Sequence, residues 1–259
     1  MNPIEPDILI PALIAGLLVL ATHIPLGMKV MARGVIFADL AVAQIAGLGI
    51  VLASLLNLTE HPLLVQIIAA LSALCGAALL TWIERNLPDV KEACIGLTFV
   101  LAASGGILLM SRDVHAGEHL KDLLVGQILW VSPSQLVATA VLSAGLLTIW
   151  RWSLRQAQDG RQDRLGHFGF YALFALAVTA SVQLVGVYLV FASLIVPALA
   201  TYRIGQKRTS YAFVIGITGY AIGLLFSALF DLPGGAAIVW AMALTGSLIA
   251  IVARHRKLD

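Results

Sequence analysis

The chain has 259 residues, of which 60% are hydrophobic and only 12% are charged, and its formal net charge is +2. Soluble domains carry about 25% charged residues, so this composition excludes a water-soluble globule of this size. It favours a chain whose surface faces a lipid bilayer.

Runs of mostly apolar residues repeat along the whole chain. A membrane helix needs about 20 such residues to cross about 30 Å of hydrocarbon, and backbone groups in lipid must be paired within a helix. The sequence therefore predicts an all-α, polytopic membrane protein with about nine transmembrane helices in a single domain, residues 1–259. The predicted spans are residues 8–28, 35–56, 62–83, 93–111, 134–150, 168–187, 189–202, 211–230 and 235–253.

One apolar stretch is too long for a single crossing. Between Leu165 and Tyr202 there is no Asp, Glu, Lys or Arg, and the stretch is bounded by Arg164 and Arg203. If both ends are cytoplasmic, the stretch is a hairpin of two crossings. Its short second leg contains Pro197, which lacks a backbone donor and favours a break or a bend.

Basic residues gather in alternate loops, and the positive-inside rule then gives the orientation. With the N-terminus outside and the C-terminus inside, the outer segments keep only Arg112 and Lys121. We therefore expect a multi-pass protein of the plasma or inner membrane, with the basic C-terminal tail inside and no nucleic-acid partner. The basic residues of the inner segments are Lys29, Arg33, Arg85, Lys91, Arg151, Arg155, Arg161, Arg164, Arg203, Lys207, Arg208, Arg254, Arg256 and Lys257.

Asp39 is the clearest charge inside an apolar span, and Gln44 follows it five positions later. Charges within membrane helices are costly and usually face a cavity or a partner, so both residues are candidate metal ligands. On a regular helix their side chains lie about 140° apart, and a kink or an irregular turn is needed for them to share one ion. The alternative is that Asp39 caps its helix or pairs near the inner surface, with Arg33 not far away.

The outer polar loop carries His115, Glu118 and His119. In a helix the two histidines share one face with Glu118 close by, and imidazole with carboxylate suits Zn²⁺, Mn²⁺ or Fe²⁺. The same spacing fits the HxxEH pattern of a membrane zinc peptidase, which we reject because no later Glu is present to complete that site. A transient metal contact at the outer mouth and a solvated polar loop both remain open.

The sequence contains no Walker Gly-rich Lys motif, so we expect no ATP hydrolysis by this chain. No pair of a nucleophile and a base is visible either. We therefore expect a chain that is not an enzyme and that binds no permanent cofactor.

Four stretches, taken in their order along the chain, resemble the metal-ion ABC permease family. The resemblance implies a fold like that of type II ABC importer permeases. It also implies the function of a membrane subunit in an ATP-driven importer of Zn, Mn or Fe. The family places a His shortly after its Asp, where this chain has Val42, Ala43 or Gln44, so the metal stays open. The four stretches are Pro25–Gly27 with Arg33 and Phe37–Asp39, then Glu92–Gly96, Gly186–Ala200 and Phe226–Gly235.

The same resemblance implies partners. Two copies of the chain would form the pathway, an extracytoplasmic metal-binding protein would deliver the ion, and separate ATPase subunits would bind the inner face. An ATPase-coupling segment would lie near Pro197 to Thr209, where Arg203, Lys207 and Arg208 would meet an acidic groove. The alternative is an ion-coupled secondary carrier without an ATPase. Such carriers often have broken helices in matching halves, and here only one half has a broken helix, at Pro197.

Overall fold

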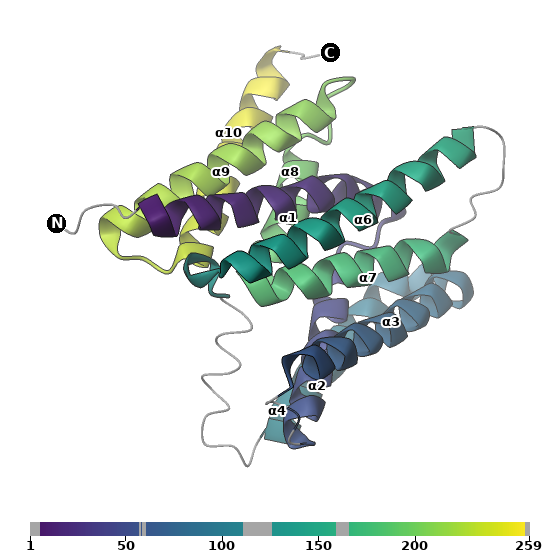
Figure 1. Ribbon diagram of the computed structural model, residues 1–259. Helices are drawn as coiled ribbons and strands as arrows, with labels where there is room; N and C mark the ends of the chain where they lie inside the picture. The colour runs from purple at the N-terminus through teal and green to yellow at the C-terminus, as the bar shows by residue number, and fades with distance from the viewer. Residues whose placement is uncertain (1–5, 57, 59–60, 111–125, 159–165, 257–259) are drawn as a thin grey trace. The chain divides into compact units, whose positions relative to one another are not determined.

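The computed structural model describes residues 6–56, 58, 61–110, 126–158 and 166–256 (Figure 1). These residues form helices and connecting turns, and none of them lies in a β-strand, so the described part of the chain confirms the all-α prediction. Seven of its helices are long and apolar enough to cross a membrane. This is the pattern of a multi-pass membrane protein; the count of nine crossings and the orientation of the termini stay predictions.

The structure divides into two compact units, and each is described by itself. The helices α6 (Pro133–Gln158) and α7 (Gly166–Val185) contribute residues to both units. Among the described residues, the first unit holds 6–33, 126–143 and 181–256, and the second holds 34–56, 58, 61–110, 144–158 and 166–180.

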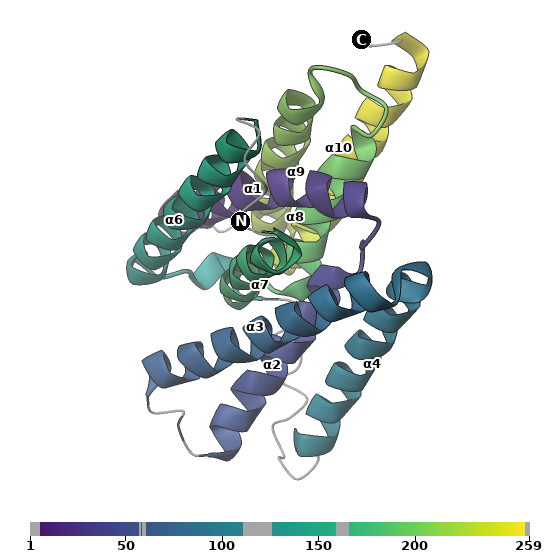
Figure 2. The same ribbon diagram turned by 90° about the vertical axis from the view of Figure 1, so that its right-hand side faces the viewer.

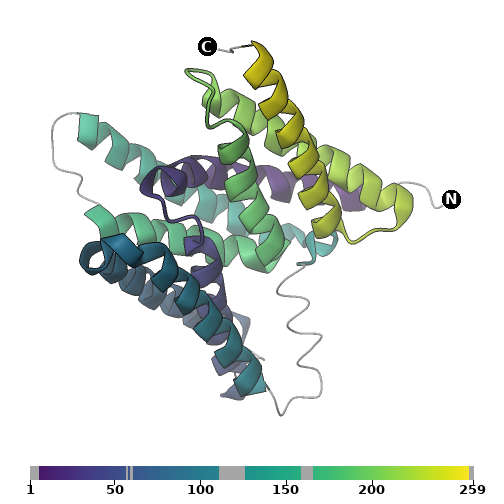
Figure 3. The same cartoon turned by 180° about the vertical axis from the view of Figure 1, so that it is seen from behind.

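The first unit is built on four helices, which are α1 (Pro6–Arg33), α8 (Val187–Ala200), α9 (Arg208–Phe230) and α10 (Gly234–Arg256). Helix α1 packs against α8 and α9, and α10 packs against α9 and α8, as the view from behind shows (Figure 3). Small residues allow close approach of membrane helices.

The second unit is built around α2 (Ala38–Leu55), which packs against both α3 (Pro62–Asn86) and α4 (Lys91–Met110) (Figure 2). A short 3₁₀ helix, η1 (Pro88–Val90), joins α3 to α4. The turn before α2 is tied to the start of α4, because the Ile36 N–H donates to Glu92 Oε1 over 2.8 Å.

Helix α6 begins at Pro133, one residue before the predicted span 134–150. The Ser132 N–H donates to Gln135 Oε1 at 2.9 Å, and the Gln135 N–H donates to Ser132 Oγ at 3.3 Å. This reciprocal capping box pairs backbone donors that a helix start otherwise leaves free. A second short 3₁₀ helix, η2 (Ile128–Trp130), precedes it.

The apolar stretch up to Tyr202 forms two helices over its described residues, α7 and α8, separated by Gly186. Gly186 has φ = 79°, a conformation that glycine adopts without steric cost. Of the two predicted effects of Pro197, the break is wrong, because α8 runs through this residue and ends at Ala200, and the bend stays a prediction. Pro197 lies close to the end of the helix, so its missing donor costs one internal bond without dividing α8. With 14 residues, α8 is about 21 Å long, and its crossing of the bilayer stays a prediction.

Candidate ion path and coupling segment

Asp39 is the second residue of α2 and is buried, with 1% of its surface exposed. Within the described part of the chain, its Oδ1 has no hydrogen-bond partner. A carboxylate is favoured at the positive end of a helix. The start of α2 therefore favours the negative charge, and one carboxylate oxygen is left able to bind a cation.

Gln44 lies on the same helix and is half-buried. Helix α2 is unbroken from Ala38 to Leu55 and has no irregular turn. The side chains of Asp39 and Gln44 therefore point about 140° apart, and α2 does not bring them together on one face.

The three residues of the predicted outer metal contact, His115, Glu118 and His119, lie outside the described residues. Within the described ranges, no group of three or more His, Cys, Asp or Glu side chains is placed to hold a metal ion. The outer contact therefore stays a prediction.

His23 is a hydrogen-bonded histidine in the core of the first unit. It is fully buried in α1, and its Nδ1 lies 3.0 Å from both the Val19 carbonyl oxygen and Thr22 Oγ1. Nε2 has no partner among the described residues.

Residues 201–207 connect α8 to α9, and we call them the coupling segment. Its backbone is folded back on itself, because the Ile204 N–H donates to the Thr201 carbonyl at 3.0 Å. Thr201 and Ile204 are buried, whereas Arg203 and Lys207 are exposed. The segment is thus anchored by two buried side chains and presents two cations outward.

Arg208, the first residue of α9, is only half-exposed. Its Nη2 donates to the Ala198 carbonyl oxygen at 3.2 Å, and its Cζ lies 5.8 Å from the centre of the Tyr202 ring. Arg208 therefore makes contacts within its own unit, which sequence reasoning missed. One signal for them exists in the sequence: a cation in the first turn of a helix opposes the dipole of that helix.

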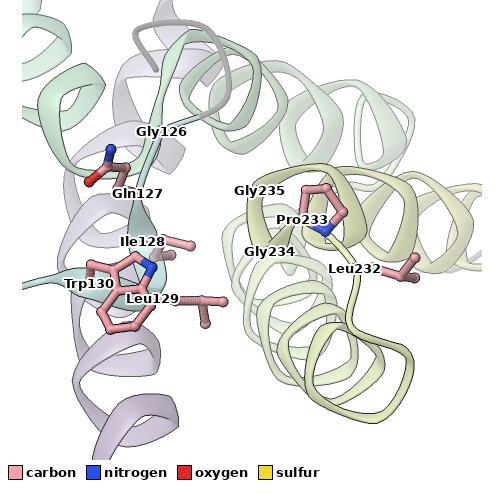
Figure 4. A pocket seen from close by; sticks show the side chains of 9 residues that line it. All are labelled: Gly126, Gln127, Ile128, Leu129, Trp130, Leu232, Pro233, Gly234 and Gly235. Atoms are coloured by element: carbon pink, nitrogen blue, oxygen red, sulfur yellow. The ribbon is translucent and has the colours of Figure 1, made fainter. Parts of the chain in front are cut away.

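At the other end of α9, Asp231 adopts a left-handed conformation with φ = 52° and ends the helix. The chain turns there, and Ser227 Oγ donates to the Leu232 carbonyl at 2.7 Å. A pocket of about 550 Å³ lies beside this turn (Figure 4). Trp130, at the edge of this pocket, is 76% exposed. The pocket is lined by Gly126, Gln127, Ile128, Leu129, Trp130, Leu232, Pro233, Gly234 and Gly235.

The helices and their apolar surfaces define a multi-pass membrane protein, and comparison with known families gives a finer assignment. Residues 5–254 match the model of the ABC 3 transport family. The chain belongs to this family, which confirms the resemblance to metal-ion ABC permeases.

Relatives are named for transport of three different metals. A probable iron transport system membrane protein of Haemophilus influenzae is 27% identical over 172 residues, which are 61% of this chain and 63% of that protein. The manganese transport system membrane protein MntC of Halalkalibacterium halodurans is 26% identical, over 88% of this chain and 81% of that protein. The high-affinity zinc uptake system membrane protein ZnuB of Haemophilus influenzae is 23% identical, over 90% of this chain and 93% of that protein.

A solved structure has the same fold. PsaBC from Streptococcus pneumoniae, in complex with Fab, superposes with a TM-score of 0.72 at 24% identity, covering 96% of this chain and 91% of that chain.

Proposed function

We propose that this chain is the membrane-spanning permease subunit of an ATP-driven importer for a divalent transition-metal ion, Zn²⁺, Mn²⁺ or Fe²⁺. One observation carries the proposal: Asp39 is buried within a membrane helix and has a carboxylate oxygen free to bind a cation. Such a charge is costly in a membrane unless it serves an ion or a partner. Membership of a transport family, with relatives named for iron, manganese and zinc, supports the metal as cargo.

Asp39 is the proposed ligand on the ion path. Gln44 projects from another face of α2, so it contributes at another point of the path or to another copy of the chain. His115, Glu118 and His119 form the proposed first contact at the outer mouth. The ion is transported, so none of these residues has to hold it permanently.

The coupling segment is the proposed contact with a separate ATPase chain, which hydrolyses the ATP. Its exposed Arg203 and Lys207 suit an acidic groove, and the segment follows directly on the end of α8, near Pro197. An extracytoplasmic metal-binding protein would deliver the ion at the opposite end of α9, beside the turn at Asp231. A second copy of the chain completes the pathway in the plasma or inner membrane.

An ATPase partner separates this proposal from an ion-coupled secondary carrier. The chain is purified from its native membrane through an affinity tag in mild detergent, and the bound proteins are identified. The proposal predicts an ABC ATPase in stoichiometric amount. A chain that purifies without any ATPase, yet transports metal when an ion gradient alone is imposed, contradicts it.

A further inference from the structure

We propose that Arg208 is a positioning residue that fastens the coupling segment to the end of α8. The inference rests on the proposed function for what the segment does, and on the geometry of the first unit for how it is held. It assigns Arg208 a contact within the chain in place of the partner contact expected from its charge.

The end of α8 shows why such a residue is needed. The last carbonyl groups of a helix have no internal donors. The Pro197 carbonyl accepts from the Thr201 N–H at 3.2 Å and from Thr201 Oγ1 at 2.7 Å, and the Leu199 carbonyl accepts from the Tyr202 N–H at 3.1 Å. The Ala198 carbonyl lies between them and is 3.5 Å from Thr201 Oγ1. Arg208 Nη2 supplies its closer donor, at 3.2 Å.

Electrostatics point the same way. Arg208 opens α9, where the helix dipole disfavours a cation, whereas the carbonyl end of α8 favours one. The guanidinium is therefore stabilised by α8 rather than by its own helix. It also lies over Tyr202, within the distance at which an aromatic face attracts a cation.

Through these contacts Arg208 connects the start of α9, the end of α8 and the segment between the two helices. Arg208 is covalently the start of α9, hydrogen-bonds the last turn of α8, and covers Tyr202 of the segment between them. Because Arg208 holds the segment to α8, a displacement of the exposed Arg203 and Lys207 is transmitted to the end of α8. A segment without this contact would move independently of α8. A planar guanidinium makes the hydrogen bond and the ring contact together, whereas a lysine ammonium is a compact point charge.

The first test measures coupling. The complete complex of permease, ATPase and metal-binding protein is reconstituted in lipid vesicles, with wild type, Arg208→Gln, Arg208→Lys and the matched charge removal Lys29→Gln, an exposed residue of α1. The metal ions transported and the ATP molecules hydrolysed are counted together. We expect Arg208→Gln to keep its bound ATPase but to transport at least fivefold less metal per ATP. Arg208→Lys should fall between, and Lys29→Gln should equal wild type.

The second test needs no partner. Trypsin is added to the detergent-solubilised chain, and cleavage after Arg203 is timed by mass spectrometry. Freed from α8, the segment of Arg208→Gln should be cleaved at least threefold faster than wild type, and Lys29→Gln should be cleaved at the wild-type rate.

The outcomes separate the two proposals. Wild-type cleavage and wild-type metal per ATP in Arg208→Gln overturn the positioning role, and so does loss of the bound ATPase, which would make Arg208 a surface contact. If Arg208→Gln does not fold, Arg208→Lys decides in the same way. Wild-type chain that binds no ATPase contradicts the proposed function alone, because the cleavage rates still report on Arg208.

Discussion

The hydroxyl groups of Ser193 and Tyr220 lie 3.0 Å apart in the interior of the first unit, where they join α8 to α9. Both side chains are fully buried. The Tyr220 ring also lies against Gly16, where any Cβ would overlap it. A single buried hydrogen bond thus helps to fix the place where α1, α8 and α9 meet.

Removing one hydroxyl of this pair should destabilise the fold. Tyr220→Phe leaves the buried Ser193 hydroxyl without its partner, and we expect the free energy of unfolding to fall by about 1–3 kcal/mol, the usual cost of a buried polar group left unpaired. The double variant Ser193→Ala with Tyr220→Phe removes both groups and should lie closer to wild type. Thermal unfolding in detergent measures both, and a Tyr220→Phe chain as stable as wild type contradicts the role of this pair.

The close approach of α1 to α8 at Gly27 gives a second prediction. A Cβ at Gly27 would overlap the backbone carbonyl of Leu194, which cannot rotate away. We expect Gly27→Ala to lower the free energy of unfolding by about 1–3 kcal/mol, as overpacking does. Gly47→Ala is the matched control, because nothing lies within 4 Å of a Cβ at Gly47. Gly47→Ala should raise the free energy of unfolding by about 0.5–1 kcal/mol, because alanine favours a helix more than glycine does. Equal unfolding temperatures for the two variants would contradict the packing.

Glu92 should matter through its hydrogen bond to the Ile36 N–H, just before α2. Glu92→Ala removes the acceptor of this part-buried bond and should lower the free energy of unfolding by about 1–3 kcal/mol. Glu92→Gln keeps an Oε1 and should lose less than half as much. Because the turn leads directly to Asp39, metal uptake should fall in the same order. Identical stability of the two variants would show that the bond is not needed.

The proposed ligand is tested by removing its charge and keeping its size. Asp39→Asn should reduce metal uptake by cells at least tenfold, because a neutral amide binds a divalent cation more weakly than a carboxylate does. The chain should still be made and still bind its ATPase. Asp7→Asn, which removes an exposed charge from α1, should leave uptake unchanged. Uptake by Asp39→Asn at the wild-type level removes Asp39 from the ion path.

Hydropathy and charge predicted much of this architecture. The predicted range 35–56 contains α2, and range 211–230 lies within α9. These elements follow from local composition, because a membrane helix must be long, apolar and internally hydrogen-bonded. The capping box at Ser132 could likewise be located from a few neighbouring residues.

Long-range contacts were beyond such reasoning. The junction of α7 and α8 at Gly186 lies close to where the predicted spans 168–187 and 189–202 meet, whereas the break suggested at Pro197 is absent, because the position of a proline along its helix decides its effect. The bond from Arg208 to Ala198 depends on how α8 and α9 are brought together, which no local pattern contains. Asp39 was found from the sequence because a charge in an apolar run is conspicuous, whereas its free oxygen required the structure.

Uptake of labelled Zn²⁺, Mn²⁺ and Fe²⁺ into sealed vesicles that contain the chain with its ATPase and binding protein tests most directly whether the chain is part of a metal importer. We predict that uptake of at least one metal requires ATP and the wild-type chain, and falls at least tenfold in Asp39→Asn. If none of the three metals enters in an ATP-dependent way while the ATPase is bound and active, the chain does not import a transition metal and the account is wrong.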